Sequence, residues 1–305
     1  MSLLDRVLAC TAHDPAPLRP WRIGDTVAGW VAPPVAAVLD RWPDPLRAEG
    51  MGWRLDDRLD SPEARAEALE AVTDRLIEAG LVRKRRDERY PVLAEWGAPL
   101  LATVDRGAAV ALGIKSFGVH INGVVESPDG PLLWIGRRSA DRALDPGKLD
   151  NIVAGGQPHG LSLAENVVKE CAEEAGIPAA LARQAVPASA ITYMMGTAEG
   201  LRRDTLFVYD LALAPDFTPE NTDGEVEAFE RWPLAAALER IRDTEDFKFN
   251  VALVIIDLAI RRGLIDPEEP DYLLLCRGLH EPTDLPAAPP RIGTNRPSWR
   301  STASV

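Results

Sequence analysis

The sequence predicts an α+β protein, a layered sandwich of sheet and helices preceded by a smaller α/β unit. The 305 residues allow about two domains of ordinary size. From about residue 117 onward, expected strands stand before, between and after helices, without the regular alternation of a doubly wound sheet. The hydrophobic fraction of 46% and the charged fraction of 27% are those of a globular chain.

Residues 1–112 are the expected N-terminal accessory domain. Ser61 followed by Pro62 starts a helix, and Gly80 ends it. The basic run at 83–86 is interpreted as a solvated connector in preference to a phosphate-binding patch, because acidic residues follow it at once. The other expected elements are a short helix or strand at 35–42, and strands or apolar docking points at 91–93 and 109–112.

Residues 113–280 are the expected main domain, and a Pro-rich tail follows over 281–305. Strands at 119–125 and 132–135 are joined across the turn sequence at 127–130. A glycine-rich turn and a strong helix come next. The later expected elements are strands at 190–193, 206–213 and 225–231, and helices at 234–243 and 250–262.

Composition excludes several classes of function. There are 34 Lys and Arg against 47 Asp and Glu, a formal charge of −13, so nucleic acid is not an expected partner. The three cysteines form no C-x-x-C pair, which favours a reduced, cytoplasmic protein. No apolar run approaches the ~20 residues of a membrane span, so no membrane association is expected.

The most informative segment is a helix expected from Leu163 to the stop at Gly176. Ser162 and Glu165 make a capping-box pattern at its start. Apolar residues at helical spacing predict one face directed to a core, and three carboxylates are expected to share another face. The core face comprises Ala164, Val167, Val168, Cys171 and Ala175, and the acidic face Glu170, Glu173 and Glu174.

Carboxylates three and four residues apart repel one another on a helix. A hard divalent cation such as Mg²⁺ or Mn²⁺ relieves that repulsion, and it commonly bridges one or two carboxylates to substrate phosphates. The alternative is an ordinary acidic surface helix. Gly155, Gly156 and Gly160 favour the metal-site interpretation, because they place a flexible loop directly before the helix, where a phosphate would be accepted.

The segment from Gly155 to Ile177 resembles the Nudix box, G-x5-E-x7-R-E-U-x-E-E-x-G-U, where U is bulky and apolar. The run KECAEEAGI at 169–177 matches its second half, with Lys169 in place of arginine. The first half departs from the pattern: Leu161 stands where the family has its first glutamate, and the loop is one residue shorter. The resemblance implies a Nudix-type α/β/α sandwich with a mixed sheet, and a divalent-metal-dependent hydrolase of diphosphate linkages.

Surrounding segments are similar to one branch of this superfamily. They include PGKLDNIVAGG at 146–156 and DGEVE at 223–227. The branch is related to the N-terminal part of thiamine pyrophosphokinases and carries an extra domain ahead of the Nudix fold. The resemblance implies a thiamine diphosphate-like substrate, oxidised forms included. The accessory domain is expected to cover the pocket or to form a homodimer contact.

The resemblance also implies roles for particular residues. Glu170, Glu173 and Glu174 would hold the metal, together with Glu225 or Glu227 from a later strand, where the two acids are expected to share a face. One of these acids would be the general base, and Lys169 would orient a carboxylate or be a plain surface charge. The candidate substrate contacts are Gly155, Gly156, one of Arg137 and Arg138, His159, Tyr193 and Lys248, whereas His120 and Trp134 are interpreted as core residues.

Two alternatives to a thiamine diphosphate hydrolase remain open. One is a Nudix hydrolase of another diphosphate, a nucleotide sugar or a dinucleotide such as ADP-ribose. The other is a catalytically silent binding module, which the missing first glutamate allows. Retention of all three helix acids favours an enzyme.

Overall fold

The computed structural model describes residues 2–141 and 144–285. The Pro-rich tail predicted over 281–305 therefore lies largely outside the described residues. Within these ranges, no helix combines the length and the apolar character that crossing a bilayer requires.

The accessory unit is built on a four-stranded sheet of order β2-β1-β4-β3. Two helices and the two-stranded sheet β5-β6 pack around it, and Trp21, Trp53 and Leu69 are at the centre of its core. Its elements are β1 (Arg19–Ile23), β2 (Thr26–Val31), α2 (Pro33–Arg41), β3 (Leu46–Glu49), β4 (Gly52–Leu55), α3 (Pro62–Glu78), β5 (Arg89–Val92), β6 (Ala102–Asp105) and the 3₁₀ turn η1 (Arg106–Ala108).

The main unit contains a seven-stranded mixed sheet whose central path is β11-β12-β7-β8-β13, with β10 paired to β7 and β9 paired to β8. Strand β12 runs parallel to β7, and the other pairs are antiparallel. The predicted mixed sheet is confirmed. The strands are β7 (Lys115–Val125), β8 (Leu132–Arg138), β9 (Leu149–Asn151), β10 (Val153–Gly156), β11 (Val186–Thr197), β12 (Gly200–Ala212) and β13 (Val226–Pro233).

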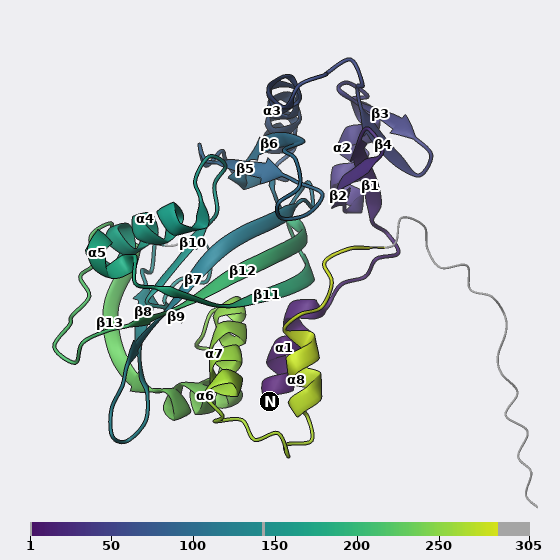
Figure 1. The fold of residues 1–305 in the computed structure, drawn as a ribbon. Helices are drawn as coiled ribbons and strands as arrows, with labels where there is room; N and C mark the ends of the chain where they lie inside the picture. The colour runs from purple at the N-terminus through teal and green to yellow at the C-terminus, as the bar shows by residue number, and fades with distance from the viewer. Residues whose placement is uncertain (1, 142–143, 286–305) are drawn as a thin grey trace, which may run out of the picture.

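Helices cover both faces of this sheet, which makes the α/β/α sandwich (Figure 1). Alternate residues of β7 divide between the two cores: Val119 and Ile121 face α4, and Val124 faces α7. On one face lie α4 (Leu163–Ala175) and α5 (Ala179–Ala182), and on the other α1 (Leu3–Thr11), α6 (Leu234–Asp243), α7 (Phe249–Arg261) and α8 (Tyr272–Gly278).

The structure decides two open expectations and adds one helix. The segment expected as a short helix or strand at 35–42 is helical as far as Arg41, because Pro33 and Pro34 open α2. Residues 109–112 are not a strand; they follow η1 as turns, and Ala109, Ala111 and Leu112 are buried in the accessory core. Helix α1 was not expected at all, and its Val7 packs in the main core, on α7 and α8. The predicted domain boundary at residue 112 remains a prediction. Helix α1 precedes this boundary in the sequence but packs on helices of the main unit.

Candidate active site

Helix α4 begins and ends where the sequence predicts. The Ser162 hydroxyl accepts a hydrogen bond from the backbone N–H of Glu165 at 3.2 Å, and the Glu165 carboxylate accepts one from the backbone N–H of Ser162 at 2.8 Å. Gly176 ends the helix in the left-handed conformation, with a φ of 62°. These caps fix the helix register and therefore the directions of its other glutamates.

The three glutamates of α4 differ in burial, and their sharing of one face remains a prediction. Glu170 and Glu174 are buried, with 8% and 9% of their surface exposed, whereas Glu173 is exposed. Positions i and i+4 lie one above the other on a helix, so Glu170 and Glu174 point together toward the sheet. The predicted apolar face is wrong at Ala164, which is exposed.

Strand β10 makes room for the two buried carboxyl groups. A Cβ atom on Gly155 would lie 2.2 Å from Cδ of Glu170, so the Glu170 side chain occupies this position only because residue 155 is glycine. The backbone N–H of Ala154 donates a hydrogen bond to Oε2 of Glu174 at 2.8 Å. Gly155 and Gly156 thus belong to a strand and not to the flexible loop expected from the sequence. Their role in this conformation is close packing.

Lys169 connects two of the glutamates. Its Nζ lies 3.0 Å from Oε1 of Glu170 and 2.8 Å from Oε2 of Glu173. Burial alone would lower the pKa of Lys169, but the hydrogen bonds to Glu173 and Glu170 raise it. The ammonium therefore stays charged and holds both carboxylates.

The buried carboxyl groups repel one another. Burial raises the pKa of Glu170, against the hydrogen bond from Lys169 that lowers it. Burial also raises the pKa of Glu174 well above its usual value, and the charges of Asp150, Glu170 and Glu225 raise it further. A cation among these groups would stabilise their ionised forms.

The donor chemistry of this group fits a hard divalent cation, because Mg²⁺ and Mn²⁺ prefer carboxylate oxygens. Glu170 and Glu174 would hold it, with Glu225 as the acid outside the helix whose charge acts on Glu174. In residues 2–141 and 144–285, no three His, Cys, Asp or Glu side chains lie close enough to form a ready-made metal-binding group.

Glu225 and Glu227 do not share a strand face, contrary to the prediction. Glu225 lies in a bend before β13 and is half-buried, whereas Glu227 is exposed on the strand. The register of β13 on β8 shifts between Val226 and Ala228, and such a bulge interrupts the alternation of side chains. The structure thus favours Glu225 over Glu227 as a neighbour of Glu174.

The predicted basic contacts are already engaged in the protein. Arg138 and Lys248 both form ion pairs with Asp150, at 2.7 and 3.3 Å, whereas Arg137 is half-exposed and lies 3.7 Å from Glu230. Burial would raise the pKa of Asp150, but Lys248 and Arg138 outweigh it and hold the pKa below its usual value. Asp150 was not predicted as a site residue, although it lies inside the 146–156 segment.

The predicted aromatic and histidine contacts differ in position. Tyr193 is fully buried, and its hydroxyl donates to Asp204, so it cannot reach a substrate in this conformation, contrary to the prediction. His159 is exposed in the loop before α4, and its contact with substrate remains a prediction. His120 is a buried core histidine, as interpreted, and its Nδ1 lies 2.9 Å from Oδ1 of Asn151.

The chain is similar to proteins named as Nudix hydrolases. The chain is 45% identical over 225 residues to Nudix hydrolase 24, chloroplastic, of Arabidopsis thaliana, covering 74% of this chain and 62% of that protein. It is 46% identical over 221 residues to Nudix hydrolase 20, chloroplastic, of the same plant, covering 72% and 59%. The chain belongs to the Nudix hydrolase superfamily. It spans about three fifths of the length of these two relatives.

Two further similarities concern parts of this Nudix protein. A family model described as "Domain of unknown function (DUF4743)" matches residues 2–116, which comprise α1 and the accessory unit. The crystal structure of DR0079 from Deinococcus radiodurans is also similar. The match covers 55% of this chain and 97% of the DR0079 chain, with 23% identity and a TM-score of 0.42.

Helix α4 carries the Nudix-box glutamates and is called the Nudix helix below. The accessory unit contacts the loop and strand that precede it. The backbone N–H of His159 donates a hydrogen bond to the carbonyl oxygen of Arg89 at 2.7 Å. The hydroxyl of Tyr90 packs against Gly156 so closely that a Cβ atom there would overlap it. Strand β5 therefore fixes the segment between β10 and the Nudix helix.

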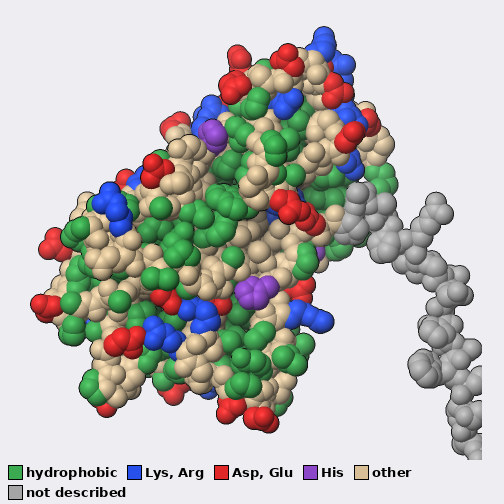
Figure 2. Space-filling model, viewed as in Figure 1, with side chains coloured by type: hydrophobic (Ala, Val, Ile, Leu, Met, Phe, Trp, Pro, Cys, Tyr) green, Lys and Arg blue, Asp and Glu red, His purple; other side chains and the backbone are tan. Residues whose placement is uncertain are grey.

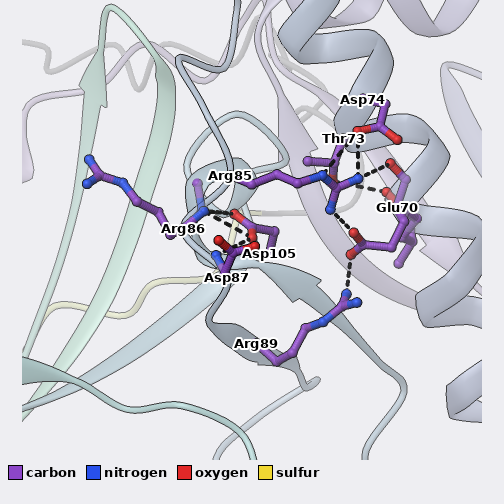
Figure 3. A network of polar contacts seen from close by, with 10 residues as sticks. Glu70, Thr73, Asp74, Arg85, Arg86, Asp87, Arg89 and Asp105 are labelled. Carbon is purple, nitrogen blue, oxygen red and sulfur yellow. Dashed lines mark hydrogen bonds and ion pairs between the residues drawn. The ribbon is translucent and has the colours of Figure 1, made fainter.

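A polar network in turn fixes the segment that leads into β5 (Figure 3). Arg85 and Arg89 both pair with Glu70 of α3, and Arg85 also pairs with Asp74 at 2.6 Å. The Asp105 carboxylate accepts hydrogen bonds from two backbone N–H groups of the segment, at residues 86 and 87. This part of the basic run thus has a structural role, in keeping with its interpretation as a connector.

Two surface hollows, of about 330 and 380 Å³, lie on the accessory unit. Pro20, Gly52 and Trp53 help to line the first, and Pro45 and Ala71 the second. No residue of the Nudix helix or of β10 lines either hollow, so neither is assigned to the carboxylate site.

Proposed function

We propose that this Nudix protein is a diphosphohydrolase that depends on Mg²⁺ or Mn²⁺ and cleaves a diphosphate linkage by attack of water. The observation that carries the proposal is the buried pair Glu170 and Glu174, which pack on Gly155 and Ala154 of β10 in a box whose second half matches the family. Buried, mutually repelling carboxyl groups are costly in a purely structural helix. Their retention is explained if they serve a charged ligand.

The side chains of this group have different roles in the reaction. Glu170 and Glu174 would supply oxygens for the cation, with Glu173 as the predicted third acid, and the bound cation would neutralise phosphate charge and lower the pKa of water. A glutamate, with Glu225 preferred over Glu227, accepts the proton of the attacking water. The new P–O bond forms as the bridging P–O bond breaks, and the leaving phosphate takes the electron pair. Lys169 keeps Glu170 and Glu173 oriented through its two hydrogen bonds.

We infer that the substrate is a thiamine diphosphate-like compound, oxidised forms included. The support is sequence similarity in the 146–156 and 223–227 segments, which resemble the branch related to thiamine pyrophosphokinases. A nucleotide sugar or a dinucleotide such as ADP-ribose is the alternative substrate. Gly155, Gly156, Arg137 and His159 are retained as candidate substrate contacts. A homodimer and a cytoplasmic location also stay predictions.

The proposal predicts that Glu174→Gln abolishes metal-dependent phosphate release. Loss of one charged group of the site lowers turnover about 100-fold or more, and Glu173→Gln is expected to follow because its oxygen belongs to the same group. The measurement is release of phosphate from thiamine diphosphate and oxothiamine diphosphate, and of AMP from ADP-ribose, during a Mg²⁺ titration.

Glu165→Gln is the matched control. It lies on the same helix, and glutamine preserves the capping box, so turnover should remain near wild type. Wild-type turnover in both Glu173→Gln and Glu174→Gln would rule out the carboxylate group as the catalytic site. Mg²⁺ binding without turnover of any diphosphate would favour the silent binding module.

A further inference from the structure

Trp96 is an exposed aromatic residue in the connection between β5 and β6 of the accessory unit, with 44% of its surface accessible. Its ring centroid lies 4.8 Å from that of Phe117 on β7 and 4.8 Å from that of Phe207 on β12, tilted by 55° to each. Phe117 and Phe207 are themselves stacked at 6.5 Å and 23°. Three rings from two structural units thus form one aromatic group.

This aromatic group lies on the same face of the sheet as the Nudix helix. Phe207 packs on the core that also contains Val167 and Cys171 of that helix, and Phe117 alternates in phase with Val119. Apolar side chains gather over the middle of the sheet on this face (Figure 2). Trp96 is the exposed member of the aromatic group, since Phe117 is buried and Phe207 is half-buried.

A short chain of contacts joins the aromatic group to the buried carboxylates. The carbonyl oxygen of Phe117 accepts a hydrogen bond from the backbone N–H of Gln157 at 2.8 Å. The next residue, Gly118, pairs with Gly156 on β10, and the neighbouring Gly155 packs on Glu170. The aromatic group and the buried carboxylates are therefore connected through neighbouring residues of the paired strands β7 and β10.

Gln157 adds a polar group at this junction. Its side chain is almost fully buried, and Nε2 donates to the carbonyl oxygen of Leu161 at 2.7 Å. Its Oε1 has no hydrogen-bond partner among the described residues. A buried acceptor without a partner is costly in a folded protein, and a ligand donor would satisfy it.

We propose that Trp96, with Phe117 and Phe207, forms a subsite that binds the planar ring of a ring-bearing diphosphate. The inference rests on the proposed function, since it assigns the non-phosphate part of the same substrate. Aromatic faces stack on heteroaromatic rings with little regard to ring identity. The accessory unit thereby takes part in substrate recognition. Trp96 distinguishes ligands that have a planar ring from ligands that do not, and it does not distinguish the substituents of the ring.

The test is calorimetric binding in the presence of Mg²⁺, with thiamine diphosphate and ADP-ribose as ring-bearing probes and isopentenyl diphosphate as the aliphatic probe. Trp96→Ala should weaken binding of the ring-bearing probe that the wild type prefers about tenfold, which falls within the range for stacking on one aromatic side chain. Binding of the aliphatic probe should not change. Trp96→Phe should restore most of the lost affinity, because a ring remains.

Trp42→Ala is the matched control, since Trp42 is a half-buried tryptophan of the same unit that contacts Arg41 and none of the three rings. It should bind all probes as the wild type does. Equal loss for ring-bearing and aliphatic probes in Trp96→Ala, no loss at all, or a wild type without preference for a ring would overturn the inference. Ring-selective binding without hydrolysis would instead leave the inference standing and refute the proposed function.

Discussion

At the scale of single residues, the interior of the main unit holds a polar cluster that no local pattern predicts. Asp150 pairs with Arg138, twelve positions earlier, and with Lys248, nearly a hundred positions later. Arg138 and Lys248 were predicted to contact substrate, because Asp150 comes close to both of them only in the folded chain. His120 beside this cluster could be interpreted correctly, since its strand neighbours are apolar.

His120 predicts an acid-side loss of stability. Burial and the charge of Lys248 lower its pKa from 6.5 to about 4, although Asp150, Asn151 and Asp204 raise it. The unfolded chain therefore binds a proton between pH 6.5 and pH 4 that the folded chain refuses, so stability falls as pH falls through this window. This one group should account for a loss of about 2 kcal/mol between pH 7 and pH 5.

The measurement is urea unfolding at pH 7, 6 and 5. His120→Gln, which keeps a hydrogen-bonding side chain, should lose less stability over this range than the wild type. His280→Gln is the control, because His280 is exposed and should leave the slope unchanged. An identical pH dependence in His120→Gln and the wild type would contradict the assignment.

At the scale of elements, the Nudix helix shows how far sequence reasoning reaches. Both ends were predictable because capping is local chemistry: Ser162, Glu165 and Gly176 act within one turn of the helix. The direction of the helix was not predictable, because it is set by the strand on which the helix packs. Burial of Glu170 depends on Gly155, which motif spacing marks as a loop glycine.

Gly155→Ala should separate folding from catalysis at this contact. The added methyl group would lie 2.2 Å from Cδ of Glu170, so the carboxylate must move. A displacement of that order lowers turnover about 100-fold, while the strand itself tolerates alanine. The measurement is steady-state diphosphate hydrolysis, with circular dichroism to verify the fold.

Gly196→Ala is the comparison variant, since its Cβ would meet only ordinary contacts at 3.8 Å or more on strand β11. It should turn over like the wild type. Full activity in Gly155→Ala would show that the observed position of Glu170 is not required for the reaction.

At the scale of the whole molecule, the main unit is completed by the start of the chain. Helix α1 places Leu3, Val7 and Cys10 in the core formed by α6, α7 and α8, before the chain enters the accessory unit. A helix of nine residues has little stability of its own, so local propensity gives a weak signal for it. The boundary at residue 112 was predicted from a change of pattern along the sequence. Such a change does not show that an earlier segment, α1, packs on the domain that follows the boundary.

Val7→Asp tests whether α1 is integral to the main unit. Val7 is fully buried and lies close to Gly278 of α8, where a Cβ atom would approach Val7 Cγ1 to 2.4 Å. A carboxylate there has no partner in the apolar core, and such a buried charge costs about 3–5 kcal/mol.

Leu8→Asp is the neighbouring control for Val7→Asp, because Leu8 is 53% exposed and its replacement should change stability by less than about 0.5 kcal/mol. Urea unfolding measures both variants, and hydrogen exchange locates the loss. If α1 closes the main core, Val7→Asp will increase exchange in α7 before it does so in α3. Equal stability of the two variants would mean that α1 only rests on the surface.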